Sequence, residues 1–228
     1  MKYISGGYFL ISPIKRPDYL DKNLIPDPLL SVSECLCDFH PDINVLWGGS
    51  QNKKEKYMEQ FKITESIYEE IEKWVGSMTE KELFEYPQMF TTLDLAREFC
   101  RKFLIHIDDV TIIGIGLSQD CADEFIEYEE TLTKPKEERN GIEKLLLSNV
   151  RVDHNGSERI GYEILGFESG KFHSYLCNGL EKDFNKQFRF SLNKDGFIPL
   201  LGEAARYCKY SNDEELGEDV LWAALGNI

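Results

Sequence analysis

The order of apolar and polar residues predicts that the chain opens with a strand followed by an irregular arm. Tyr3–Ile11 is rich in aromatic and aliphatic residues around Gly6-Gly7, which predicts a strand with a bulge or sharp bend at the glycines. Prolines then recur from Pro13 to Pro41 and leave little room for a regular helix. The apolar residues between them indicate a wrapped arm or surface loop, and Asn44–Trp47 is a candidate for a short strand.

Helical periodicity dominates the segment that follows the arm. In Lys56–Val75, apolar residues recur at three- and four-residue spacing and predict an amphipathic helix, which Gly76 is expected to end; they are Ile63, Ile67, Ile71, Trp74 and Val75. Thr79 and Glu82 have the spacing of a capping box, which predicts a short second helix. Thr91 or Thr92 is then expected to begin a third helix that runs to about Leu104.

Beyond residue 105 the pattern alternates between strands and helices. Val110–Leu117 is apolar on both faces, as expected of a central strand. Two runs separated by a Glu-Ser-Gly turn predict a hairpin. The expected elements in this region are a helix from Asp120 to about Thr131, a charged connection at Lys134–Asn140, a helix at Ile142–Leu147, the hairpin strands Arg159–Phe167 and Lys171–Cys177, a strand at Phe188–Leu192, a turn at 193–196, a helix at Pro199–Tyr210, an exposed acidic loop at Ser211–Asp219 and a segment at 221–225 that docks on the core.

These elements predict one α/β domain of the mixed α+β kind that spans residues 1–228. We expect a single sheet with several packed helices, and an irregular proline-rich N-terminal arm with edge strands over residues 1–50. A weaker subdivision stays open near residues 134–140, because the break there is short.

The chain is strongly acidic, with 41 acidic and 26 basic residues and a formal net charge of -15. A protein that binds phosphate backbones must supply lysine and arginine, so the charge argues against a nucleic-acid ligand. It favours a basic partner by long-range attraction, although acidity that only keeps the protein soluble is an equal alternative. No apolar run approaches the 20 or so residues that a membrane helix needs, and we predict neither a membrane partner nor a signal peptide.

The cysteines are predicted to be reduced thiols in a cytoplasmic protein, and the sequence predicts no cofactor. Cys35, Cys37 and His40 resemble half of a metal site, but zinc needs three or four ligands and no second pair follows. We therefore predict no metal site, and a metal or redox role of this group stays open.

Three further patterns contain residue types found in catalytic or cofactor sites. Gly114 and Gly116 match the start of a dinucleotide-binding loop, but the acids that follow would repel a pyrophosphate. His173 and Cys177 would lie about 13 Å apart if both belonged to one strand, too far for a base to activate a nucleophile. His106 lies beside two aspartates, yet a lone histidine before a strand is more often structural.

The acidic segments carry the site prediction. At 100° per residue, the acidic residues of the helix after the central strand lie on one side of that helix. A second acidic block lies near the C-terminus. Each block has a tyrosine beside it that could serve as an aromatic anchor. A surface that holds both blocks would attract a basic groove, and simple solvation of both is the alternative. The predicted partner-binding residues are Asp120, Asp123, Glu124, Glu127, Tyr128, Glu130, Tyr210, Asp213, Glu214, Glu215, Glu218 and Asp219.

In overall type the chain resembles the immunity proteins of bacterial toxin–immunity systems. The resemblance rests on size, acidity, the aromatic-rich hairpin Gly161–Cys177 and the lack of a recognisable active site. It implies a non-enzymatic inhibitor that binds a cognate basic toxin or nuclease domain, and it assigns no functional residue. The alternatives are a carboxylate- and metal-dependent hydrolase with an unrecognised site, and, less favoured, a DNA mimic.

Overall fold

The computed structural model describes residues 3–36, 55, 58–59, 61–85, 89–105, 107, 109–131, 141–152, 159–168, 171–217 and 223–227. Within these ranges the named elements follow one another as β1 (Ile4–Ile11), η1 (Glu34–Leu36), α2 (Glu65–Glu80), β2 (Phe84–Glu85), β3 (Met89–Phe90), α3 (Leu93–Phe103), β4 (Thr111–Leu117), α4 (Gln119–Thr131), α5 (Gly141–Ser148), β5 (Gly161–Glu168), β6 (Lys171–Ser174), η4 (Tyr175–Asn178), α6 (Glu181–Gln187), α7 (Leu201–Asp213) and β7 (Ala223–Asn227), where η denotes a 3-10 helix.

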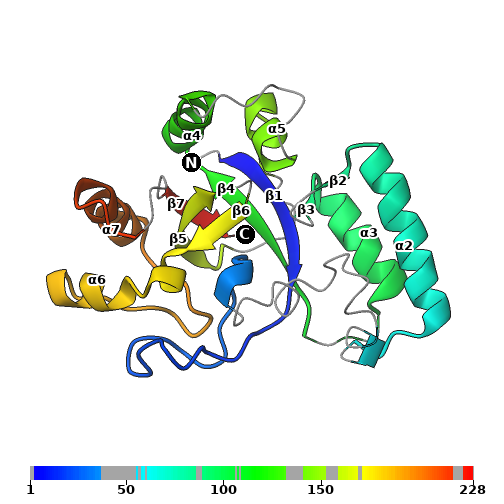
Figure 1. Ribbon diagram of the computed structural model, residues 1–228, viewed down its shortest axis with the longest axis horizontal. Coiled ribbons are helices and arrows are strands. Elements are labelled where there is room, and N and C mark those ends of the chain that lie inside the picture. Colours follow the sequence, from blue (N-terminus) through cyan, green and yellow to red (C-terminus); the bar gives the residue numbers. More distant parts are fainter. Residues whose placement is uncertain are drawn as a thin grey trace.

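The described strands form one seven-stranded sheet in the order β2-β3-β1-β4-β7-β5-β6 (Figure 1). All recorded pairings between neighbours are antiparallel. The predicted mixed α+β class, the single sheet, the central position of β4 and the β5–β6 hairpin are confirmed. The C-terminal strand β7 lies between β4 and β5, so the last residues of the chain complete the middle of the sheet.

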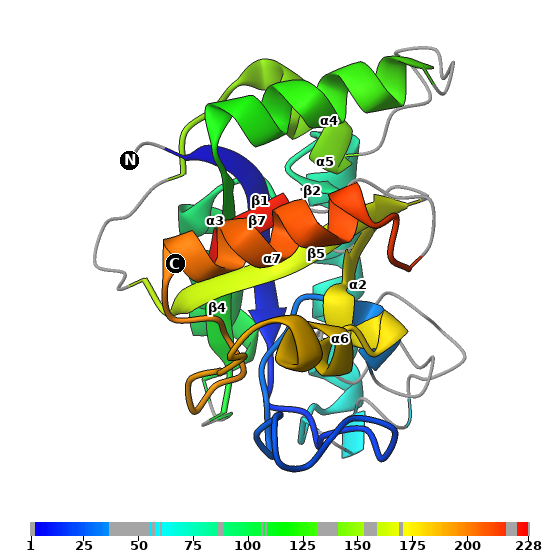
Figure 2. The same cartoon turned by 90° about the vertical axis from the view of Figure 1, so that its left-hand side faces the viewer.

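Alternation along the strands gives the sheet two apolar faces. Tyr8 and Leu10 of β1 belong to the core under α2 and α3, which contains Trp74 and Phe99. Phe9 lies in a second core with residues of α4 and α5. A third core joins α6 and α7 to β5 and to the N-terminal arm. Figure 2 shows α4 above α7 along one side of the molecule, with α2 and α3 farther back.

The predicted bulge in β1 is confirmed. The register between β1 and β4 shifts between Ser5 and Tyr8, and Gly7 has a φ of +100°. The Ser5 hydroxyl accepts a hydrogen bond of 3.2 Å from the backbone N–H of Gly7. A Cβ at Gly7 would collide with the side chain of Met89, so both the φ and the space require glycine.

The N-terminal arm packs on its own domain. Ile14 and Leu29 exchange backbone hydrogen bonds of 2.9 and 3.0 Å, which fold the arm back on itself. Ile25, Leu29 and Leu36 are buried in the third core. The predicted strand Asn44–Trp47 and the predicted connection Lys134–Asn140 lie outside the described residues. Among the described residues, no helix is long and apolar enough to cross a membrane.

The predicted bounds of the helix at Lys56–Val75 are wrong at both ends. The Thr64 hydroxyl caps α2 by accepting from the N–H of Ile67 at 3.4 Å, so α2 begins at Glu65. The helix then continues through Gly76, which is exposed with open space around its Cα, and through Thr79 to Glu80. Gly76 therefore does not end the helix, and the predicted capping box at Thr79 does not begin one, because the continuous apolar stripe of α2 outweighs both local signals.

Two strand predictions in the C-terminal part are also wrong. The strand predicted at Lys171–Cys177 ends at Ser174, whose hydroxyl accepts from the N–H of Leu176 at 3.2 Å and starts the 3-10 helix η4. Phe188–Leu192 is an irregular segment without a strand, and its aromatic rings pack against Tyr207 of α7. The helix α6 was not predicted, and α7 runs to Asp213 where an exposed loop was expected.

Candidate functional site

The helix α4 presents carboxylates on the face that it does not bury. The Ser118 hydroxyl accepts from the N–H of Cys121 at 3.2 Å at the start of the helix. Ala122 and Phe125 are buried in the second core and fix the rotation of the helix. Acidic residues at the intervening positions are therefore exposed.

The helix α7 lies on β5 and β7 and presents a second acidic end. Ala204, Tyr207, Cys208 and Ser211 are its buried residues. One turn from its C-terminus, Nζ of Lys209 donates to Oδ2 of Asp213 at 2.8 Å. This ion pair is exposed and contributes little to stability, so it can open for a partner.

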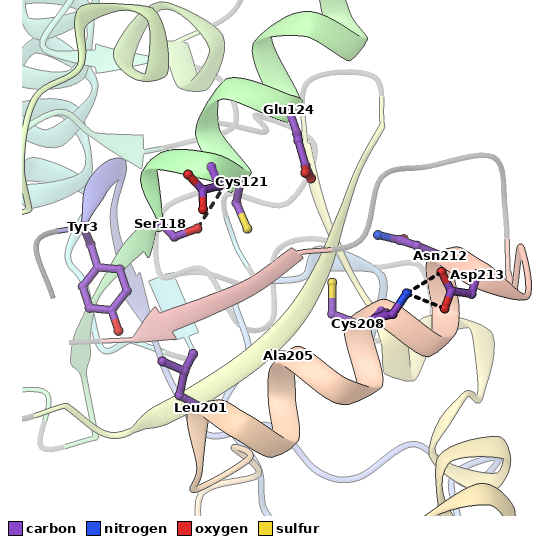
Figure 3. A pocket seen from close by; sticks show the side chains of 11 residues that line it. Tyr3, Ser118, Cys121, Glu124, Leu201, Ala205, Cys208, Asn212 and Asp213 are labelled. Atoms are coloured by element: carbon purple, nitrogen blue, oxygen red, sulfur yellow. Dashed lines mark hydrogen bonds and ion pairs between the residues drawn. The ribbon is translucent and has the colours of Figure 1, made fainter.

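A cavity of about 460 Å³ lies between α4 and α7. Figure 3 shows its lining side chains, with Glu124 and Cys121 projecting from α4 and Cys208 from α7 toward the gap between the two helices. The structure thus brings members of both predicted acidic blocks to one hollow. The lining residues are Tyr3, Ser118, Asp120, Cys121, Glu124, Leu201, Ala205, Cys208, Lys209, Asn212 and Asp213.

The charges and walls of this cavity suit a cationic side chain. Asp120, Glu124 and Asp213 supply carboxylates, and Lys209 supplies the single ammonium group among the lining residues. No side-chain hydrogen bond or ion pair engages the carboxylate of Asp120 or of Glu124 among the residues that the structure describes. Leu201 and Ala205 add an apolar wall to the cavity. The aliphatic part of a lysine or arginine could pack on this wall while its charged group lies among the carboxylates.

The other predicted site residues of α4 do not line the cavity. Oδ1 of Asp123 accepts a hydrogen bond of 2.9 Å from the Gln119 side chain, and Glu127 is exposed farther along the helix. Tyr128 and Glu130 belong to the helical backbone of α4, and their side chains lie outside the description.

Tyr210, predicted as an aromatic anchor, packs inside the domain. Its ring meets those of Phe184 and Phe188 edge-on, with centroids 6.4 and 5.3 Å away, and it is not among the cavity residues. Glu214 and Glu215 are exposed directly after α7, and Glu218 and Asp219 lie outside the described residues.

A second cluster brings together residues that the sequence analysis placed in two separate groups, Cys35 in half of a metal site and His173 with Cys177 as a distant pair. Cys35 in η1, His173 in β6 and Cys177 in η4 place one sulfur or nitrogen atom each within 4.8 Å of one another. Sγ of Cys35 lies 3.1 Å from Nδ1 of His173. The expected separation of about 13 Å between His173 and Cys177 is wrong, because η4 turns the chain back directly after β6.

A chain of polar contacts leads from this cluster into the interior. Oγ of Ser33 lies 3.2 Å from Sγ of Cys177, and the N–H of Ser33 donates to Oγ of Ser31 at 3.0 Å. Ser31 in turn donates to Oε1 of Glu163 at 2.7 Å. Burial raises the pKa of the Glu163 carboxyl to about 7. The neighbouring Cys35 thiol, followed by burial, raises the pKa of Cys177.

The glycine pattern on β4 has a structural role, and the other candidate residues are not described by the structure. A Cβ at Gly116 would come within 2.7 Å of Cβ of Tyr3, so this glycine permits close packing on β4. Cys37, His40 and His106 are not among the described residues.

No protein-family model matches the chain, and comparisons with curated proteins and with solved structures found no match.

Proposed function

We propose that this protein is an acidic inhibitor of the immunity type, which neutralises a basic toxin or nuclease domain in the cytoplasm by binding it directly. The observation that carries the proposal is the shared cavity of α4 and α7, at which Asp120 and Glu124 meet Asp213. These residues come from acidic blocks about 90 positions apart, and the cavity gives them one location.

The charge of the whole chain supports the same assignment. A net charge of -15 draws a basic protein toward the surface before contact, and the cavity carboxylates then select an orientation. A hollow of about 460 Å³ falls in the size range of pockets that bury a projecting side chain or small ligand. A lysine or arginine of the partner is therefore the expected central contact.

The test compares two variants that remove the same number of carboxylates. Asp120→Asn/Glu124→Gln/Asp213→Asn alters the cavity, whereas Glu69→Gln/Glu70→Gln/Glu80→Gln alters exposed positions of α2 and leaves an equal net charge. A basic protein captured by the wild-type chain from host lysate is purified, and its association rate is measured with each variant across a salt series.

We expect the cavity variant to associate at least about tenfold more slowly at low salt, and the α2 variant to stay within about twofold of the wild type. Equal slowing of both variants would mean that only net charge matters and would overturn the cavity assignment. Stoichiometric loss of the partner's own activity on binding separates an inhibitor from a simple binding protein, and persistence of that activity would refute inhibition.

A steric variant tests the cavity without changing its charge. Ala205 is exposed and lines the cavity from α7, so Ala205→Trp should fill the space that the partner's side chain needs. Ser66→Trp adds the same bulk to an exposed position of α2 as a control. Affinity should fall at least about tenfold for the first variant and remain unchanged for the second.

A further inference from the structure

We propose that Cys35, His173 and Cys177 form a binding site for a zinc ion, independent of the acidic cavity, with which the cluster shares no residue. The three residues come from separate elements, η1, β6 and η4, which the fold brings together.

The separations between the ligand atoms fit tetrahedral zinc. Bonds of about 2.3 Å to sulfur and 2.0 Å to nitrogen place neighbouring ligand atoms of a tetrahedron about 3.5–3.8 Å apart. The three atoms already lie within 4.8 Å of one another, and Sγ of Cys35 lies 3.1 Å from Nδ1 of His173. Changes of at most about 1 Å in these separations, within reach of side-chain rotations, would therefore give zinc geometry.

The ligand types select a soft ion. Two thiolates and one imidazole favour zinc over magnesium or calcium, which take oxygen ligands. Cys35 and Cys177 carry thiols that are not in disulfide bonds, and all three side chains are partly exposed, which leaves a path by which an ion can enter. Three protein ligands leave one tetrahedral position for water or for another group.

The surroundings hold the ligands in place. His173 pairs with Gly166 across the β5–β6 hairpin, and Cys177 follows within the 3-10 helix that Ser174 caps. The Ser33 hydroxyl, 3.2 Å from Sγ of Cys177, is positioned to donate to a metal-bound thiolate. Ser33 is itself buried, so it acts as a positioning residue behind the ligand.

The experiment uses the full chain, stripped with a chelator, reduced, and titrated with zinc alone. We expect one zinc per chain by elemental analysis, a rise in thermal midpoint, and slower alkylation of Cys35 and Cys177 but not of Cys121. Cobalt in place of zinc should give the thiolate charge-transfer bands of a tetrahedral site, and X-ray absorption of the zinc form should show two sulfur ligands.

Variants assign the ion to this cluster. Cys35→Ala, His173→Ala and Cys177→Ala should each weaken zinc binding at least about a hundredfold, and Ser33→Ala by roughly tenfold or more. Cys100→Ala is the matched control, because Cys100 is another half-buried cysteine whose burial raises its pKa to about 11. It should bind zinc like the wild type.

Several results would overturn the site. The reduced wild-type chain could fail to retain zinc, the zinc could show only nitrogen and oxygen ligands, or Cys35→Ala and Cys177→Ala could bind as tightly as the wild type. Because the spectra and the stoichiometry are measured on the wild-type chain, a variant that does not fold leaves the test decisive.

Discussion

Oγ of Ser31 donates a hydrogen bond of 2.7 Å to Oε1 of Glu163, a residue 132 positions away. Both side chains are buried, Ser31 in the N-terminal arm and Glu163 in β5. The bond therefore connects the N-terminal arm to the sheet through the Glu163 carboxyl group. Burial raises the pKa of this group. Its pKa of about 7 compares with an ordinary value of 4.5.

This carboxyl predicts a pH dependence of stability. Between about pH 4.5 and 7 the folded chain keeps the proton of Glu163 and the unfolded chain releases it, so the free energy of unfolding falls as pH rises. Glu163→Gln removes the ionisable group and keeps the size and shape of the side chain. From about pH 5 to 8 the wild type should lose about 2–3 kcal/mol relative to the variant in denaturant unfolding.

Glu70→Gln provides the control, since it removes an exposed carboxylate from α2. Its unfolding curves should follow those of the wild type at every pH. A constant difference in stability between the wild type and Glu163→Gln across the same range would contradict a raised pKa at Glu163.

A single substitution, glycine to alanine, should have opposite effects at two positions. At Gly7, alanine would need a φ of +100° and would press its Cβ against Met89, so unfolding should become easier by at least about 2 kcal/mol. At Gly76, which lies in α2 with open space where an added Cβ would point, alanine should stabilise by about 0.5–1 kcal/mol. Chemical denaturation measures both, and a loss of stability at Gly76 would mean that α2 does not continue through it.

The aromatic core under α2 and α3 gives a prediction about packing. Phe99 is fully buried, and its ring centroid lies 5.2 Å from that of Trp74 and 5.0 Å from that of Phe103. Phe99→Ala should cost about 3–5 kcal/mol of unfolding free energy, and Phe99→Leu less, because leucine refills part of the cavity. Leu147→Ala, at an exposed position of α5, should change stability by less than about 0.5 kcal/mol.

Elements with a strong local pattern were predictable from the sequence. The strands β1 and β4, the Thr92 cap of α3 and the β5–β6 hairpin each follow from signals within a few residues. The strand β7 has no such signal, because Ala223–Asn227 contains no β-branched or aromatic residue and shows no clear alternation. Its place is determined by its pairing with β4 and β5, strands far away in the sequence.

The difference between local signals and long-range packing also explains how much of the two candidate sites could be predicted. Composition identified the acidic residues of α4 and of the C-terminal block, but their meeting at one cavity depends on how α4 and α7 pack. Cys35 and His173 are 138 positions apart, so no spacing in the sequence could pair them. The error at Cys177 was local, since a strand was assumed where Ser174 starts a 3-10 helix.

The proposed docking of a cation makes a prediction with an unusual sign. Lys209 is the one cationic residue among the described residues that line the cavity, and it forms an ion pair of 2.8 Å with Asp213. Lys209→Gln would leave Asp213 available to the partner and remove a like charge. Association with a basic partner should therefore become about two- to fivefold faster at low salt, and the gain should shrink as salt rises.

Lys194→Gln is the matched control for that prediction. Lys194 also forms an exposed ion pair of 2.8 Å, with Asp195, so its loss changes net charge and removes a similar contact away from the cavity. Both substitutions should alter stability by at most about 1 kcal/mol, because exposed ion pairs contribute little. Faster association with Lys209→Gln alone would locate the incoming cation beside Asp213. Equal acceleration by both would assign the effect to net charge, and slower association with Lys209→Gln would mean that Lys209 itself contacts the partner.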